Sequence, residues 1–367
     1  MMRSSLARTR AVVRPASVFV SLVILAILAS GCASRSTRPV STPSQVGLLS
    51  TYPEVLDAAM TANGGNGSLV LYGGHPFTSR QTQTFDTWLW NGRLWEKHVQ
   101  ANGPQLSSPS IGYEPRRGQL LLVGIGDGYP SKLETWKWTD RGWNQLHPAT
   151  APPTYFAVSA LVPFNSGLLL YLLRPIARGA PEVTYDMWYW DGKDWHLQST
   201  SYRTPDRPLQ HFVPLPGGGA GDLTGFATGA DALATTSIAR WTGSSWDQHP
   251  VSNGPGMIAA ATIDPVTGDL LVLGSRYVSM GDFAPPVDST FLFDGKGWKS
   301  TPLPGELNGK VGMEVAGYPA LPGVALWGGS QGYGNAGPPH PDPFQAAMWY
   351  WNGQVWTRVA RAAGVGG

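Results

Sequence analysis

The side chains best suited to binding a ligand are histidines, arginines, tyrosines and aspartates in six irregular segments of the chain. These segments cover residues 75–86, 125–134, 174–186, 229–237, 275–289 and 330–347. The candidate ligand-binding residues in them are His75, Arg80, Asp127, Tyr129, Arg174, Arg178, Tyr277, Asp282, Tyr333, His340 and Asp342. Polar groups on loops of a rigid scaffold commonly form binding sites. The alternative is that these segments are tolerated surface insertions, which their Pro and Gly content also fits.

No pattern of residues indicates a catalytic centre or a bound cofactor. His340-Pro-Asp342 offers two metal ligands, but two ligands without a spacing signature do not define a metal site. Gly217-Gly218-Gly219 follows Pro216 and precedes no helix pattern, so it indicates a turn rather than a phosphate-binding loop. The chain has no basic stripe for nucleic acid. We expect no catalytic residue, cofactor, metal or nucleic-acid partner.

Cys32 is the only cysteine of the chain and lies just after an N-terminal targeting segment. Four arginines precede an apolar run of 11 residues, Val18 to Leu28. That run is too short to span a bilayer, which needs about 20 residues, so it indicates a signal peptide. Ala29-Ser30-Gly31-Cys32 resembles a bacterial lipobox, although Ala replaces the usual first Leu. The resemblance implies a lipidated Cys32; an ordinary secretory signal with an incidental cysteine is the alternative.

Six hairpin-like motifs recur along the chain, and each ends in a tryptophan five residues after the preceding aromatic residue. The final tryptophans are Trp95, Trp143, Trp195, Trp246, Trp298 and Trp356, which are 48, 52, 51, 52 and 58 residues apart. Fifteen of the 16 tryptophans belong to this motif, and only Trp327 lies outside it. A period of about 50 residues is typical of propeller blades.

The aromatic-x-aromatic pattern predicts a strand with both rings on one face. Asn91-Gly92 and its equivalents predict a two-residue type I′ turn. In that register Trp88 lies opposite Trp95, and Trp90 lies opposite Arg93. The repeated tryptophans could instead form sugar-stacking platforms, but their fixed position relative to the turn favours packing in the core.

Each repeat also contains a Gly-closed turn and a short apolar run, such as Gly118-Gln-Leu-Leu-Leu-Val-Gly, after a run of small residues. Each repeat therefore predicts four strands and no helix. The sequence predicts an all-β fold, a six-bladed β-propeller of four-stranded antiparallel blades. How the ring closes is open; a closing strand from the Gly47 to Tyr52 segment is possible.

The order of apolar strand, Gly-Gly, variable loop, aromatic strand, turn and Trp resembles the kelch repeat of galactose-oxidase-type propellers. The double glycine is kept at Gly73-Gly74 and Gly328-Gly329, and the resemblance covers about 310 of 367 residues. Galactose oxidase needs a Cys–Tyr crosslink in its propeller, and this chain has no Cys after position 32. The turns at Asp191 and Asp294 lack the register of sialidase Asp-boxes. The resemblance therefore implies a fold but no activity.

The sequence predicts four consecutive regions. They are a signal peptide at 1–31, the lipidated Cys32 with a flexible Ser/Thr/Pro-rich tether at 32–51, the propeller at 52–361, and a disordered tail at 362–367. The predicted blades cover approximately 52–100, 101–148, 149–200, 201–251, 252–303 and 304–361. The formal charge is +2, and it falls to near −2 without the four signal arginines.

We therefore expect a lipoprotein of the bacterial cell envelope, anchored to a membrane through its lipid alone. Its propeller is expected to be a monomer that binds a protein or a glycan through one loop face. The alternative function is a glycan-processing enzyme, similar to a sialidase or another glycosidase, with its site at the mouth of the propeller channel.

Overall fold

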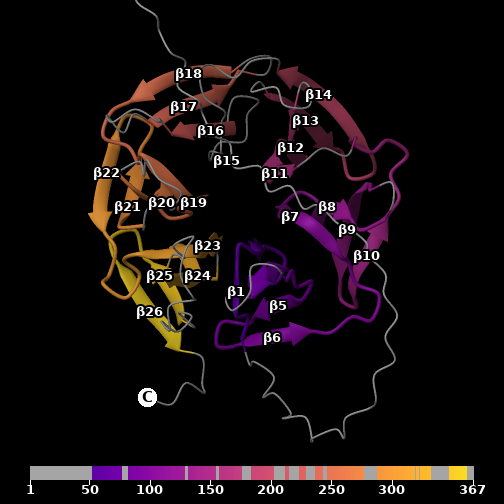
Figure 1. The fold of residues 1–367 in the computed structure, drawn as a ribbon, viewed down its shortest axis with the longest axis horizontal. Helices are drawn as coiled ribbons and strands as arrows, with labels where there is room; N and C mark the ends of the chain where they lie inside the picture. The colour runs from indigo at the N-terminus through magenta and orange to yellow at the C-terminus, as the bar shows by residue number, and fades with distance from the viewer. Residues whose placement is uncertain are drawn as a thin grey trace, which may run out of the picture. The chain divides into compact units, whose positions relative to one another are not determined.

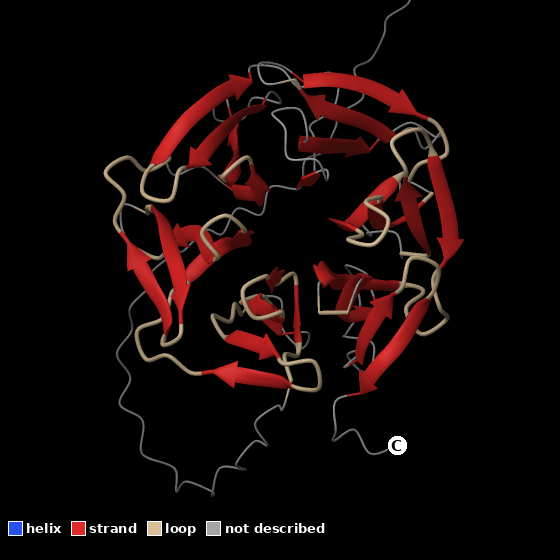
Figure 2. Cartoon of the chain, turned by 180° about the vertical axis from the view of Figure 1, so that it is seen from behind, coloured by secondary structure: helices blue, strands red, loops and turns tan. Residues whose placement is uncertain are grey.

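The computed structural model describes most of the repeat region. The described residues are 52–76, 82–128, 131–153, 157–175, 183–201, 211–214, 223–228, 236–242, 246–276, 287–318, 320–321, 323–331 and 347–361. They all lie in the second of two compact units, Leu49–Gly367. The described elements are strands, with no helix among them (Figure 2), and thus no helix there that could cross a membrane.

Within these residues the strands form six four-stranded antiparallel sheets and one two-stranded pair. The first sheet contains β2 (Ala59–Asn63), β3 (Ser68–Tyr72), β5 (Thr87–Trp90) and β6 (Trp95–His98). The second contains β7 (Leu106–Glu114), β8 (Gln119–Gly126), β9 (Leu133–Thr139) and β10 (Gly142–Leu146). The third contains β11 (Ala157–Phe164), β12 (Gly167–Pro175), β13 (Val183–Trp190) and β14 (Trp195–Ser201). The fourth sheet contains β15 (His211–Pro214), β16 (Leu223–Thr228), β17 (Thr236–Trp241) and β18 (Trp246–Val251). The fifth contains β19 (Met257–Ile263), β20 (Leu270–Ser275), β21 (Ser289–Phe293) and β22 (Trp298–Pro302). The last contains β23 (Lys310–Tyr318), β24 (Gly323–Gln331), β25 (Ala347–Trp351) and β26 (Trp356–Arg361). The pair is β1 (Val55–Leu56) with β4 (His75–Pro76).

The sheets are arranged as a β-propeller. The first strand of each sheet contacts the first strand of the next, and β23 contacts β2, so the inner strands form a closed cycle (Figure 1). Each sheet follows the order of the sequence without a crossover. The four-stranded antiparallel blades predicted from the repeats are therefore confirmed.

The hydrophobic core is divided among the junctions between neighbouring sheets. Each of the six clusters of buried side chains joins residues of adjacent sheets, including β23–β26 with β2–β6. Twelve of the motif tryptophans are buried in these clusters, and Trp195, for example, has 0% of its surface exposed, while Trp138 and Trp298 pack against the clusters partly buried. This burial confirms that these twelve tryptophans are packing residues rather than sugar-stacking platforms.

The predicted register of the hairpins is wrong. Trp90 lies directly opposite Trp95, and Trp88 lies opposite Lys97. The reason in the first hairpin is the turn, which has four residues rather than two; in the second hairpin Thr139 pairs with Gly142, so the two-residue turn lies one position later than predicted. The side-chain Oδ1 of Asn91 accepts hydrogen bonds from Arg93 N and Leu94 N, at 3.0 and 3.1 Å. This side chain stabilises the longer turn, and Gly92 supplies its left-handed residue (φ 97°).

Indole hydrogen bonds join neighbouring sheets across three of the junctions. The Nε1 of Trp143 donates to Thr87 Oγ1 at 2.9 Å, and that of Trp195 donates to Thr135 Oγ1 at 3.0 Å. Between the last two sheets, Trp356 Nε1 donates to Thr290 Oγ1 at 2.8 Å. Each threonine lies three residues before the aromatic residue that precedes the hairpin turn. The motif therefore carries polar bonds between blades as well as apolar packing.

The ring closes through Trp327, the tryptophan outside the repeat. Its Nε1 donates to Pro53 O at 3.1 Å, and its ring makes edge contacts with Tyr52 and Trp95. Strand β1 contacts β23 and β24. The segment that closes the ring thus includes residues Tyr52 to Leu56. The segment predicted for closure, Gly47 to Tyr52, overlaps it only at Tyr52, and residues 47–51 lie outside the described residues.

The double glycine of the first sheet allows this segment to fit. Gly74 has a φ of 93°, and a Cβ there would lie 2.8 Å from Leu56 O and 3.1 Å from the Cβ of Val55. No other residue type fits this conformation and this approach without strain. Gly74 therefore places β1 against the end of the first sheet.

Candidate functional site

Three of the candidate ligand-binding residues lie within the described part of the chain. His75 is on β4, Asp127 is exposed just after β8, and Arg174 is on β12. The strands that carry or precede them belong to three different sheets, β1–β4, β7–β10 and β11–β14. The others, and Cys32, lie outside the described residues: Arg80, Tyr129, Arg178, Tyr277, Asp282, Tyr333, His340 and Asp342.

A carboxyl pair that the sequence analysis did not single out lies where the last sheet meets the first. Glu314 is in the middle of β23, opposite Trp327 on β24. Paired residues of an antiparallel ladder point to the same face of the sheet, so Glu314 faces the first sheet, as Trp327 does. The backbone N–H of Ala58 donates a hydrogen bond to its carboxyl group, and Asp57 lies close enough to act on it electrostatically.

Burial and, to a smaller extent, the negative charge of Asp57 raise the pKa of Glu314 to about 8, against the opposing effect of the Ala58 N–H. At neutral pH this carboxyl group is therefore largely protonated, although its residue keeps part of its surface exposed. It can donate and accept a hydrogen bond. Asp57 itself is exposed and has an unusual left-handed backbone (φ 55°).

His75 lies beside this pair. It is opposite Leu56 in the β1–β4 ladder, so it neighbours the residue that precedes Asp57. Its Nδ1 is 3.2 Å from Thr82 O. One predicted residue thus lies at the place where the ring closes. The sequence signal for Glu314 was a single carboxylate within an inner strand of otherwise small or apolar residues, and pattern reasoning passed over it.

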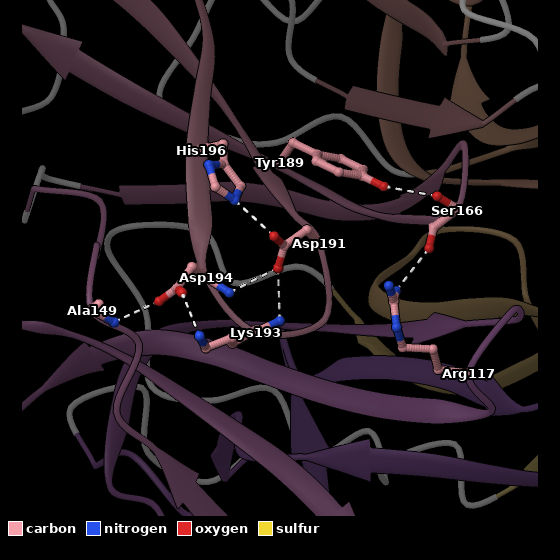
Figure 3. A network of polar contacts seen from close by, with 8 residues as sticks. All are labelled: Arg117, Ala149, Ser166, Tyr189, Asp191, Lys193, Asp194 and His196. Carbon is pink, nitrogen blue, oxygen red and sulfur yellow. Dashed lines mark hydrogen bonds and ion pairs between the residues drawn. The ribbon is translucent and has the colours of Figure 1, made fainter.

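A second polar network lies between the second and third sheets (Figure 3). Asp191 Oδ1 accepts from Lys193 N and Asp194 N, at 2.8 and 2.9 Å, and Asp191 Oδ2 lies 2.8 Å from His196 Nε2. The backbone N–H of Asp194 and the His196 side chain lower the pKa of Asp191 to about 2. An aspartate–histidine pair of this kind could orient an imidazole for proton transfer.

Equivalent positions in other blades argue that this pair is structural. The turn residue and the residue after the final tryptophan also bond as Asn91 with Glu96, at 2.6 Å, and as Asp294 with Lys299, at 3.4 Å. Three chemically different pairs therefore connect the two strands at one position. Their shared property is the bridge across the hairpin, not the chemistry of a histidine.

The same network connects the two sheets to each other. Arg117 pairs with the fully buried Glu114 at 3.2 Å and donates from Nη1 to Ser166 O at 2.9 Å. Its guanidinium lies against Gly192, where a Cβ would come within 2.6 Å of Cζ. On the other side of the hairpin, Asp194 Oδ1 accepts from Ala149 N at 2.6 Å. These contacts link the two sheets, so the network stabilises the junction, although Glu114 Oε2 is buried without a hydrogen-bond partner in the described structure.

No group of three or more potential metal ligands occurs among the described residues. The carboxyl pair of Glu314 and Asp57 at the closing junction is the candidate site. A carboxyl group with a raised pKa could bind hydroxyl groups or supply a proton.

Comparison with known proteins gives the fold and no family. Neither a scan against protein-family models nor a search of curated protein sequences gives a match. Among solved structures, the fucose-specific lectin from Aleuria aurantia is similar, with 13% identity, a TM-score of 0.53, and coverage of 83% of this chain and 96% of the lectin. AofleA from Arthrobotrys oligospora is similar with 13% identity, a TM-score of 0.53, and coverage of 84% and 86%. Another Aleuria aurantia lectin structure, described as a six-bladed β-propeller, has 12% identity, a TM-score of 0.50, and coverage of 83% and 96%. At this level of identity, the similarity establishes a β-propeller shared with these lectins.

Proposed function

We propose that this protein is a glycan-binding propeller of six blades, with the kelch-like repeat as its unit, held outside the cytoplasm of a bacterium by a lipid on Cys32. The supporting observation is the shared fold: two fucose-binding lectin structures superpose over nearly their whole length. The six four-stranded sheets and their closed cycle of inner strands support the blade number.

The connections between second and third strands are the proposed binding face. Alternating strand directions bring all six connections to one end of a propeller. Most of the described motif tryptophans are not available as platforms, because they are buried between the sheets. The candidate residues on the connections are therefore the polar and aromatic groups left for recognition, and a rigid ring presents them at little ordering cost.

A glycan array on the purified propeller, residues 52–361, tests this proposal. We expect selective binding, and we expect replacement of residues 332–346 by a short Gly-Ser linker to weaken it without changing the melting temperature. The matched control neutralises Arg93, Lys193 and Lys296 on the hairpin turns. If the control loses binding while the loop variant keeps it, the assigned face is wrong; if no glycan binds, a protein partner becomes the better hypothesis.

The proposed anchor has its own test. Metabolic labelling with a fatty-acid analogue should mark the wild-type chain in a bacterial host and leave Cys32→Ala unlabelled. Cleavage at another position, without incorporated fatty acid, would indicate an ordinary secretory signal. Size-exclusion chromatography with light scattering tests the expected monomer.

A glycan-processing enzyme is the second candidate, and one observation favours it. Burial raises the pKa of Glu314 close to Asp57, and a carboxyl group with a raised pKa beside a second carboxyl group is an arrangement that many glycoside hydrolases use. Incubation with the glycans that bind on the array tests this candidate. Product release that is lost in Glu314→Gln supports the enzyme, and its absence leaves the binding function.

A further inference from the structure

The junction between the last sheet and the first differs from the other five in how it is held. Consecutive sheets are joined by a connecting peptide, whereas no peptide joins β26 to β2 at the closing junction. Only non-covalent contacts hold the ring there. A propeller whose blades are otherwise linked in series will open most easily at that place.

The closing junction also lacks the indole–threonine bond, a property that it shares with the two linked junctions at which Met187 and Ile238 occupy the threonine position. Met348 occupies the position, three residues before the hairpin aromatic, at which Thr87, Thr135 and Thr290 accept indole bonds in other blades. The facing Trp95 Nε1 is buried and has no hydrogen-bond partner within the described structure. A buried donor without a partner weakens a junction by the cost of its lost hydration.

Two contacts replace the missing bond, and both hold the segment from Tyr52 to Ala58. Trp327 Nε1 bonds to Pro53 O, and Glu314 accepts a hydrogen bond from Ala58 N. A Cβ on Gly312 would lie 2.9 Å from the Cβ of Leu56, so the segment is packed tightly against β23. Glu314 is therefore part of the closure itself.

The charged surroundings of Glu314 are simple. The strands packed against β23 are β1, β2, β19 and β24, and none of them contains a titratable residue. Asp57, between β1 and β2, raises the pKa of Glu314 through its charge. Three other titratable residues lie on or next to these strands: His75 on β4, opposite Leu56; Glu54 just before β1; and Lys310 at the start of β23. Within the described residues, only Asp57 contributes a charge effect on Glu314.

We propose that this junction is a proton-controlled seam: when Glu314 loses its proton, the segment from Tyr52 to Ala58 and strand β2 separate from β23, and the ring opens at this one place. The ionised carboxylate bonds more strongly to Ala58 N–H. However, it carries a charge into an apolar junction beside Asp57, and separation of the strands hydrates that charge. Opening exposes the inner strands on both sides of the junction and gives a ligand lateral access to the channel.

Hydrogen exchange of the propeller, residues 52–361, measured by mass spectrometry at pH 6 and pH 9 and corrected for intrinsic exchange rates, tests the seam. In the wild type we expect the protection of peptides from β2 and β23 to fall about tenfold or more at pH 9. Peptides from β8 and β12 serve as internal controls and should keep their protection. In Glu314→Gln, the amide stays neutral, so the two pH values should give the same protection.

Asp57→Asn supplies the second variant, because Asn tolerates a left-handed backbone. Removal of this charge lowers the pKa of Glu314 in the closed ring and makes its ionised form less costly there, so less protection should be lost between pH 6 and pH 9 than in the wild type. A uniform loss of protection around the ring, the same pH response in Glu314→Gln, or an undiminished loss of protection in Asp57→Asn would overturn the proposal. If Glu314→Gln does not fold, the wild type and Asp57→Asn still decide it.

Discussion

The junction between the second and third sheets and the junction between the last and first sheets solve one packing problem in two ways. The first uses a neutral bond from Trp195 to Thr135, the ion pair of Arg117 with the buried Glu114, and the Asp191 network. The second uses a terminal segment, Trp327 and a protonated Glu314. The comparison teaches that motif residues can supply a polar bond across a chain-linked junction, as at three of them, whereas the closing junction is held by residues from outside the motif.

Truncation of Trp195 should have the largest effect at the linked junction. The ring is fully buried and packs against Trp190 at a centroid distance of 5.1 Å. Trp195→Ala should lower the free energy of unfolding by about 3–5 kcal/mol, measured by urea denaturation. Leu197→Ala on the same strand is the control, since that side chain is 51% exposed and should change stability little. Equal stability of Trp195→Ala and wild type would show that the junction does not depend on the motif.

The closing junction should differ from the linked one in its response to pH. The pKa of Glu314 is raised from 4.5 to about 8 in the folded protein, so the folded state binds the extra proton between these values. Its contribution to stability is complete below pH 4.5 and is lost as the pH rises to about 8, with a slope of at most about 1.4 kcal/mol per pH unit.

Urea denaturation at several pH values measures this slope in the wild type and in Glu314→Gln. The variant should lose the Glu314 part of the decline and be more stable than the wild type at pH 9. The same slope in both proteins would show that Glu314 does not respond to pH as its burial implies.

Removal of the threonine acceptor at the linked junction should have an intermediate effect. Thr135→Val keeps the shape of the side chain but leaves Trp195 Nε1 without its partner, which should cost about 1–3 kcal/mol. The matched change at the closing junction is Met348→Leu, which removes no hydrogen bond and should cost less than about 1.5 kcal/mol. If both variants lose the same stability, the hydrogen bond does not distinguish the junctions.

The hairpin of Asp191 should show the smallest effect. Asp191→Ala removes the acceptor of two backbone N–H groups and of His196, so we expect a loss of about 1 kcal/mol. Asp191→Asn keeps an acceptor for the turn and should lose less. The low pKa of Asp191 adds stability above pH 3.8 that is lost as the pH falls toward 2, so the wild-type advantage over Asp191→Asn should vanish in acid. Thermal melts at pH 6 and pH 2.5 measure both effects.

Much of the architecture could be predicted from the sequence because the information is local and repeated. The alternation around Trp88 and Trp90 predicted a strand, and Gly118 with its apolar run predicted the turn and the second strand. Burial of the motif tryptophans followed from their constant distance to the turn. The hairpin register did not follow, because Asn91 stabilises a longer turn with its side chain, and a dipeptide preference does not include that bond.

By itself, the sequence determined the four-stranded repeat and the aromatic packing residues of its hairpins, since both depend on neighbours within about 50 positions of the chain. Only the tertiary structure decided how the ring closes and which carboxyl group has unusual chemistry. Trp327 and Pro53 are 274 positions apart, and Glu314 acquires its raised pKa from burial against residues at the other end of the propeller sequence. Such properties arise from proximity in space, which a local pattern of residues does not contain.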